Sequence, residues 1–183
     1  MNHLVIDTET TGLSPRFNKT LTVGMILADI NKNHLKILEE NHIFIKHDHH
    51  NINPQALKIN KINIEEHDKM AIPPCQACNQ INNFIKENSL EETPLLGHNI
   101  AFDKRFLCAL FDQGETFSKF HHQSFDTMQI WRGLRREGIV PSNLKASLEA
   151  ISDFFDIDYT KAHNALDDCK ITAQVYHKML KII

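Results

Sequence analysis

Apolar residues follow the pattern of strands in the first quarter of the chain. A short apolar run over residues 2–7 predicts a buried strand, and residues 20–30 are apolar and rich in β-branched side chains. A further strand is predicted over residues 34–46, after the break Asn31-Lys32-Asn33, which is typical of a hairpin turn. We therefore expect three antiparallel strands to open the fold.

From Asn53 onward the apolar spacing becomes helical. Pro73-Pro74 predict the start of a helix that runs to about Asn88, and residues 95–97 predict a short buried strand. Further helical patterns cover residues 100–111, 127–137, 144–155 and 164–181. This order predicts an α/β fold in which helices flank a mixed sheet, and the 183 residues, without a repeat or linker, predict one domain over 1–183.

Composition restricts the class of protein only broadly. Apolar residues make up 42% and charged residues 23%, as in ordinary globular domains. The net charge of −3 does not attract a polyanion, so any nucleic-acid groove must be local. Four cysteines are too few for a disulfide framework, and neither a signal peptide nor an apolar run of about 20 residues is present. We expect a cytoplasmic protein with no membrane partner.

The most informative segment is Asp7-Thr8-Glu9, which follows the first apolar run. Residues two apart on a strand point to the same face, so the two carboxylates lie close together. At a separation of about 4 Å they repel by roughly 4 kcal/mol at an effective dielectric constant of about 20. A cation between them removes this cost, and Mg²⁺ or Mn²⁺ is the natural partner of carboxylate oxygens.

A two-metal site needs more than two carboxylates. Asp103 follows the predicted strand at residues 95–97 and enters a helix, so it can face the sheet edge near Asp7. Asp168 lies just inside the last predicted helix, and His163 precedes it by five residues, within reach of a water beside the metal. Asp167 is offset by about 100° around the helix, so we assign Asp168 to the site.

The segments Asp-x-Glu-Thr-Thr-Gly at residues 7–12, His-Asn-x-x-Phe-Asp at 98–103 and His-x-x-x-x-Asp at 163–168 resemble the motifs of the DEDDh 3′–5′ exonucleases. That family includes the proofreading subunit of bacterial DNA polymerase III and ribonuclease T. The resemblance implies a ribonuclease-H-like fold, two divalent cations (Mg²⁺ or Mn²⁺) and release of nucleoside 5′-monophosphates from DNA or RNA. It implies that metal ligation falls to Asp7, Glu9, Asp103 and Asp168, and that His163 is the general base.

By the same resemblance, the substrate is a nucleic-acid 3′ end, expected to be single-stranded. Thr10, Thr11 and Gly12 would contact the terminal nucleotide, Leu13 would wedge between the last two bases, and Phe102 would line the base pocket. Such contacts are tolerant of sequence. Nothing in the motifs distinguishes DNA from RNA.

The chain departs from the family pattern in one loop and one strand. Asn60 stands where many relatives carry histidine, and is expected to approach the terminal nucleotide in its place. Lys61 replaces a glycine, and Leu21-Thr22-Val23-Gly24 lacks a common glutamate. No long tail follows the last helix, so we expect a free-standing enzyme without a stable polymerase partner. Both a monomer and a homodimer are compatible with the sequence.

Several features have simpler readings. Cys75-x-x-Cys78 lacks two further zinc ligands nearby, and His47-Asp48-His49-His50 reads as a solvated loop more readily than as a metal site. His98 is expected to make a structural hydrogen bond, and Asp126 is expected to cap a helix. The basic segment Trp131–Arg136 is either a solvated helix face or a contact with the nucleic-acid backbone.

Two functions compete with the exonuclease. One is an inactive nucleic-acid-binding or adaptor module on the same fold, which the complete carboxylate set disfavours. The other is a phosphodiesterase restricted to short oligonucleotides.

Overall fold

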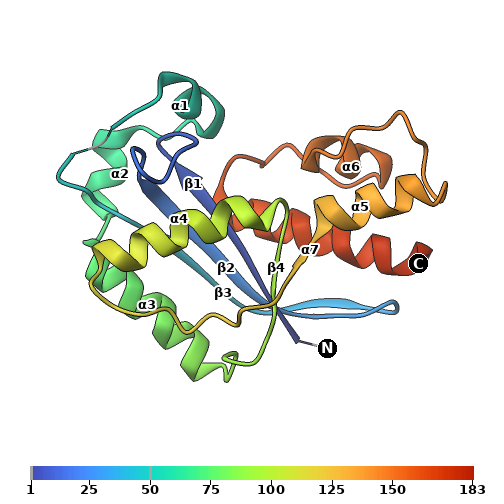
Figure 1. Ribbon diagram of the computed structural model, residues 1–183, viewed down its shortest axis with the longest axis horizontal. Coiled ribbons are helices and arrows are strands. Elements are labelled where there is room, and N and C mark those ends of the chain that lie inside the picture. The colour runs from blue at the N-terminus through green and yellow to red at the C-terminus, as the bar shows by residue number, and fades with distance from the viewer. Residues whose placement is uncertain (1, 50) are drawn as a thin grey trace.

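The computed structural model describes residues 2–49 and 51–183. Its centre is a five-stranded sheet in the order β3-β2-β1-β4-β5 (Figure 1). β1 (Asn2–Thr10), β2 (Thr20–Ile30) and β3 (Leu35–Phe44) are antiparallel neighbours, whereas β4 (Leu95–Gly97) and β5 (Ser124–Asp126) run parallel to β1. The predicted mixed sheet and its three opening antiparallel strands are confirmed.

The predicted bounds of two strands are wrong. β1 continues past residue 7 to Thr10, because it pairs with β2 along its whole length, from Asn2 opposite Asp29 to Glu9 opposite Thr22. The acidic pair therefore lies within the strand. β3 ends at Phe44, and its predicted last residues form only an isolated bridge between Ile45 and Ile72.

Seven helices follow in the part of the chain that the structure describes. They are α1 (Pro54–Asn60), α2 (Ile64–Met70), α3 (Pro74–Glu87), α4 (Ile100–Gln113), α5 (Thr127–Arg136), α6 (Leu148–Phe154) and α7 (Ala165–Ile182). α6 is shorter than predicted because Ser147 caps its first turn by accepting from the Ala150 amide. The predicted cap at Asp126 is confirmed, since its side chain accepts from the Met128 amide at the start of α5.

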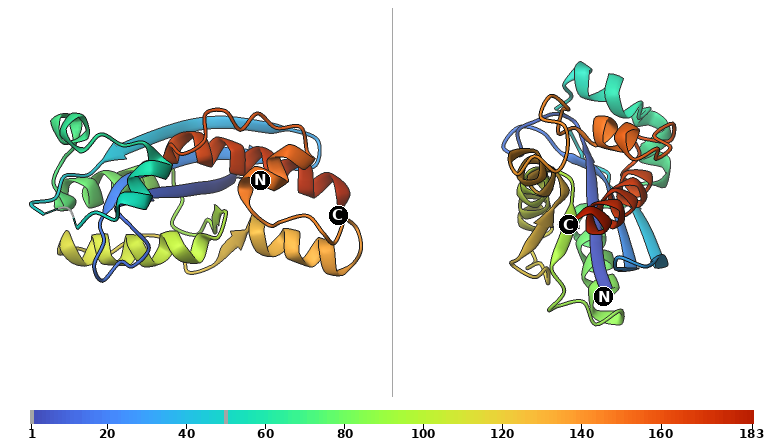
Figure 2. Two further views of the ribbon diagram at one scale, coloured as in Figure 1. Left: turned by 90° about the horizontal axis from the view of Figure 1, so that it is seen from above. Right: turned by 90° about the vertical axis from the view of Figure 1, so that its right-hand side faces the viewer.

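The helices cover both faces of the sheet (Figure 2). Leu4 and Ile6 of β1 pack with α3 and α4, through residues such as Ile81 and Leu107. Val5 packs on the other face against α7, with Cys169 and Ala173. Because side chains alternate along a strand, Asp7 and Glu9 lie on the α7 face and Thr8 on the α4 face. None of the described helices is both long and apolar enough to span a membrane.

Candidate metal centre

Three carboxylates meet where α7 begins on the sheet. Asp7 and Glu9 come from β1 and Asp168 from the first turn of α7, and one oxygen from each lies within 4.8 Å of the others. The start of α7 is fixed by Asn164, whose side chain accepts from the amides of Leu166 and Asp167. Asp168 is about 160 residues from Asp7 and Glu9 along the chain, and the structure brings the three carboxylates together as predicted.

Gly24 of β2 allows α7 to come this close. It lies opposite Asp7 in the sheet, and a Cβ at this position would sit 2.4 Å from the backbone carbonyl oxygen of Ala165. Only a residue without a side chain fits against a helix backbone at that distance. Sequence reasoning noted the missing glutamate here and overlooked this role, although a glycine inside a β-branched strand indicates a close backbone approach.

A fourth carboxylate, that of Asp103, comes from the first turn of α4. It is buried, and its Oδ1 accepts from the Thr8 amide at 3.0 Å and from the Thr8 hydroxyl at 2.7 Å. It is not one of the three carboxylates that lie within 4.8 Å of one another. Its charge nevertheless acts on Asp7 and Glu9, so ligation of a second metal by Asp103 stays a prediction. The part played by Thr8 was not foreseen.

Burial and mutual repulsion raise the pKa values of the carboxylates. Burial, reinforced by the charges of Asp103, Asp168 and Glu9, raises the pKa of Asp7 well above its ordinary value. Burial and the neighbouring Asp168 raise the pKa of Glu9 to about 8. Burial likewise raises the pKa of Asp103 to about 7 and that of Asp168 to about 6. Without a cation, the cluster is therefore costly to ionise.

The donor set fits a divalent cation. Oδ1 of Asp168 is buried and, among the described residues, has no hydrogen-bond partner. A buried carboxylate oxygen without a donor is unfavourable unless a cation or water takes its lone pairs. Three converging carboxylates are hard oxygen ligands, which suit Mg²⁺ or Mn²⁺ better than a soft metal.

His163 sits at the rim of the cluster. Its backbone adopts a left-handed conformation with φ of 74°, and its amide donates to Oδ2 of Asp168 at 3.2 Å. Its ring meets Tyr159 edge-on, with centroids 5.9 Å apart, and is half-buried. Left-handed non-glycine residues are uncommon and concentrate at functional sites.

The segment after the acidic pair is tightly held. The Thr10 hydroxyl donates to the Gly12 carbonyl at 2.7 Å, and the buried Thr11 hydroxyl donates to the Asn51 carbonyl at 2.9 Å. Leu13 is 75% exposed, as a side chain that inserts between bases must be. Phe102 of α4 is half-buried and packs on Phe106, with ring centroids 4.8 Å apart. Contacts of these residues with a nucleotide stay predictions.

The loop that departs from the family pattern supports the metal centre. Asn60 is buried, its side chain donates to the Thr10 carbonyl at 3.2 Å, and its amide opposes the rise in the pKa of Glu9. It therefore lies beside Glu9, and its predicted contact with a nucleotide is untested. Lys61 adopts φ of 55°, the left-handed conformation that favours glycine, so the loop keeps the geometry that the substitution put in question.

The secondary candidates have structural roles. His98 hydrogen-bonds through Nδ1 to the Thr127 hydroxyl at 2.9 Å, and Trp131 of α5 is fully buried against Phe154 and Phe155. Cys75 and Cys78 are free cysteines, and the carboxylate cluster is the only group of three or more metal-binding side chains among residues 2–49 and 51–183.

The predicted solvated loop is wrong for His47. Its side chain is buried and hydrogen-bonds to the Thr20 carbonyl at 2.7 Å. His50 lies outside the described residues.

The fold is RNase H-like, and its carboxylate cluster makes this a domain of the metal-binding kind. Exonuclease I superposes with a TM-score of 0.79 at 23% identity, over 98% of this chain and 40% of that one. The complex of E. coli exonuclease I with a dT13 oligonucleotide gives a TM-score of 0.77 at 22% identity, over 97% of this chain and 40% of that one. The present chain thus spans about two fifths of those structures, and the likeness concerns the fold.

A family model described as "Exonuclease" matches residues 4–176, so the chain belongs to the DEDDh exonuclease family. Ribonuclease T of Wigglesworthia glossinidia brevipalpis is 30% identical over 94% of this chain and 81% of its own length. Ribonuclease T of Buchnera aphidicola is 28% identical over 97% of this chain and 82% of its own length. The protein is accordingly a 3′–5′ exonuclease of a family that depends on divalent metals, as the motifs predicted.

Proposed function

We propose that this exonuclease removes nucleoside 5′-monophosphates from single-stranded 3′ ends by a two-metal mechanism, with His163 as general base. The observation that carries the proposal is the meeting of Asp7, Glu9 and Asp168 within 4.8 Å. We also propose that residues 1–183 form one exonuclease domain.

Asp7, Glu9 and Asp168 would hold the cations, with Asp103 supporting the second from behind Thr8. Two divalent cations, when bound, activate a water and neutralise charge on the phosphate and the leaving 3′ oxygen. His163 would accept the proton of the attacking water, since imidazole changes its protonation near neutral pH. The edge contact with Tyr159 limits where the His163 ring can turn.

Two observations support a single-stranded substrate. The exposed Leu13 stands at the end of β1, where it can separate unpaired bases. The E. coli exonuclease I structures with dT13 and dA16 carry oligonucleotides on the same fold. DNA and RNA both remain candidate substrates, as do Mg²⁺ and Mn²⁺ as the working metal.

The test is a digestion panel with 5′-labelled twenty-nucleotide DNA and RNA, single- and double-stranded, in Mg²⁺, Mn²⁺ or EDTA. We expect stepwise shortening from the 3′ end and mononucleotide release that requires the metal. Asp168→Asn abolishes release, whereas Asp167→Asn, the same change one residue earlier on α7, retains it. Melting temperatures verify that both variants fold.

Each competing function predicts a different result. An inactive binding module releases no mononucleotide with either metal. A phosphodiesterase restricted to short oligonucleotides cleaves a dinucleotide and leaves the twenty-mer intact. Either result contradicts the proposal.

A further inference from the structure

The loop between β1 and β2 exposes two large apolar side chains beside the metal centre. Leu13 is 75% exposed and Phe17 is 58% exposed. The loop leaves β1 directly after Glu9 and Thr10, so both side chains stand at the carboxylate end of the strand. Neighbouring apolar side chains left in water next to an active site indicate a ligand that covers them.

This loop is a built structure. The Thr11 amide donates to the Lys19 carbonyl at 2.9 Å and closes the loop at its base. The Asn18 side chain donates to the Asn51 carbonyl at 2.9 Å and accepts from the Ser14 amide at 3.1 Å, which ties the tip to a distant segment. Phe17 is therefore presented by a fixed backbone.

The tip of the loop is a single tight turn. The Ser14 carbonyl accepts from the Phe17 amide at 3.0 Å and from the Asn18 amide at 2.7 Å. Leu13 precedes this turn and Phe17 is its last residue, so one short loop presents both exposed apolar side chains.

Arginines stack on the aromatic rings of this region. The Arg16 guanidinium lies 5.4 Å from the centroid of the Phe17 ring, and the Arg105 guanidinium lies 5.9 Å from that of Phe102. An aromatic face with a cation next to it suits a nucleotide, whose base stacks while its phosphate is attracted. These local cations contrast with the net charge of −3.

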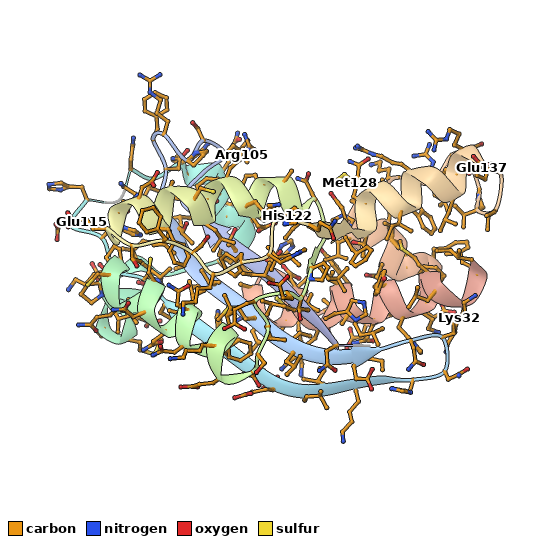
Figure 3. The ribbon with its side chains drawn as sticks, turned by 60° about the horizontal axis from the view of Figure 1, so that its bottom comes forward. Lys32, Arg105, Glu115, His122, Met128 and Glu137 are labelled. Atoms are coloured by element: carbon orange, nitrogen blue, oxygen red, sulfur yellow. The ribbon has the colours of Figure 1, made fainter. Side chains whose placement is uncertain are left out.

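The two arginine–phenylalanine pairs belong to adjacent elements. The Thr20 hydroxyl, where the loop enters β2, donates to the Phe106 carbonyl of α4 at 3.4 Å. Figures 1 and 2 show the loop beside α4, and Figure 3 shows Arg105 on the side of α4 next to it. A single strand whose 3′ end lies near Phe102 and Leu13 is expected to pass the loop that carries Phe17.

We propose that Phe17, with Arg16 stacked on it, is a second base-stacking platform that binds a nucleotide upstream of the 3′ end. The inference rests on the proposed function, because only a 3′ end held at the carboxylates brings upstream nucleotides to this loop. Stacking makes no use of the base edges, so the platform accepts any base.

The test compares Phe17→Ala with wild type on a dinucleotide and on a single-stranded twenty-mer. We expect KM for the twenty-mer to rise about fivefold or more, which is the change that about 1 kcal/mol of lost stacking produces. We expect kcat to hold, and the dinucleotide, too short to reach the platform, to be cleaved as by wild type. Phe17→Trp restores the wild-type KM.

Phe117→Ala is the matched control, because Phe117 is 92% exposed on a loop that hydrogen-bonds to Asn82 of α3. It should leave KM unchanged for both substrates. An unchanged KM of Phe17→Ala on the twenty-mer, or an equal rise on the dinucleotide, overturns the platform while the exonuclease stands.

A binding measurement separates this inference from catalysis. Fluorescence anisotropy of a 5′-labelled twenty-nucleotide oligothymidylate with Asp168→Asn protein requires no hydrolysis. Adding Phe17→Ala should weaken binding by the same factor of about five. Equal affinity of the two proteins, or no binding by either, refutes the platform. Failure of the exonuclease proposal appears instead as wild-type protein that releases no mononucleotide.

Discussion

At the scale of single residues, the site is a set of charges that the folded chain holds at a cost. Asp7 and Glu9 are adjacent on one face of β1, and Asp168 adds a third carboxylate with a buried oxygen that no described residue satisfies. Thr8 and Asn60 are uncharged, but the hydrogen bonds of Thr8 orient Asp103, and the Asn60 amide favours the ionised form of Glu9. Ligands and supporting residues together make the geometry.

Replacement of His163 tests the base at this scale. His163→Asn removes the proton acceptor but leaves the three carboxylates in place, so we expect kcat to fall by about 10²–10⁴-fold with little change in KM. Thermal shift on adding Mn²⁺ should match that of wild type, because the ligands remain. A kcat within tenfold of wild type would remove His163 from the mechanism.

At the scale of elements, the site depends on how closely α7 approaches the sheet. Gly24 of β2 faces the Ala165 backbone with no room for a side chain, and Asp168 is one helical turn further along. Two residues with left-handed backbone flank helices at the site: Lys61 follows α1, and His163 precedes the N-cap of α7. Local backbone geometry thus sets where the ligands converge.

Gly24→Ala should push α7 away from β2, because the added Cβ meets backbone that cannot rotate aside. We expect a loss of about 1–3 kcal/mol in the free energy of unfolding and a fall of at least about tenfold in kcat, since a misplaced ligand weakens the metal centre.

Gly133→Ala in α5 is its control, because nothing lies within 4 Å of the added Cβ. A helical Gly→Ala change there should stabilise the protein by about 0.5–1 kcal/mol and leave kcat unchanged. Urea unfolding and initial rates measure both variants. Wild-type activity in Gly24→Ala would show that the close approach is unnecessary.

At the scale of the whole molecule, the sheet brings together carboxylates that repel in the absence of metal. Unfolding separates them and returns each pKa to its ordinary range near 4. In the folded, metal-free protein the pKa of Asp168 is raised to about 6 and that of Glu9 to about 8. The folded state therefore binds more protons than the unfolded state between about pH 4 and about pH 8.

It follows that the stability of the metal-free protein falls as pH rises from about 4 to about 8. In EDTA, Asp168→Asn should flatten this fall and be more stable than wild type at pH 8 by about 1 kcal/mol or more, since one pKa unit corresponds to about 1.4 kcal/mol. Unfolding in urea at pH 5 and pH 8 measures the difference. Parallel pH dependence in the two proteins would contradict the repulsion.

Most strands and helices, and the motif residues of the site, follow from local sequence patterns and were predictable. Runs of β-branched and apolar residues give the strands, helical spacing gives α3, α4 and α7, and the motif residues Asp7, Glu9 and Asp168 indicated a metal centre. The bounds of β1 were misjudged because pairing with β2 keeps the polar residues from Asp7 to Thr10 in the strand. Pairing partners are not visible in a local pattern.

The sequence by itself determined the kinds of residue at the site, because the acidic and imidazole chemistry of the motifs depends on residue type and spacing. Only the tertiary structure decided which groups work together. Thr8 holding Asp103 and Gly24 admitting α7 are contacts formed in space. They depend on distances of a few ångströms between packed elements, which the order of residues along the chain does not specify.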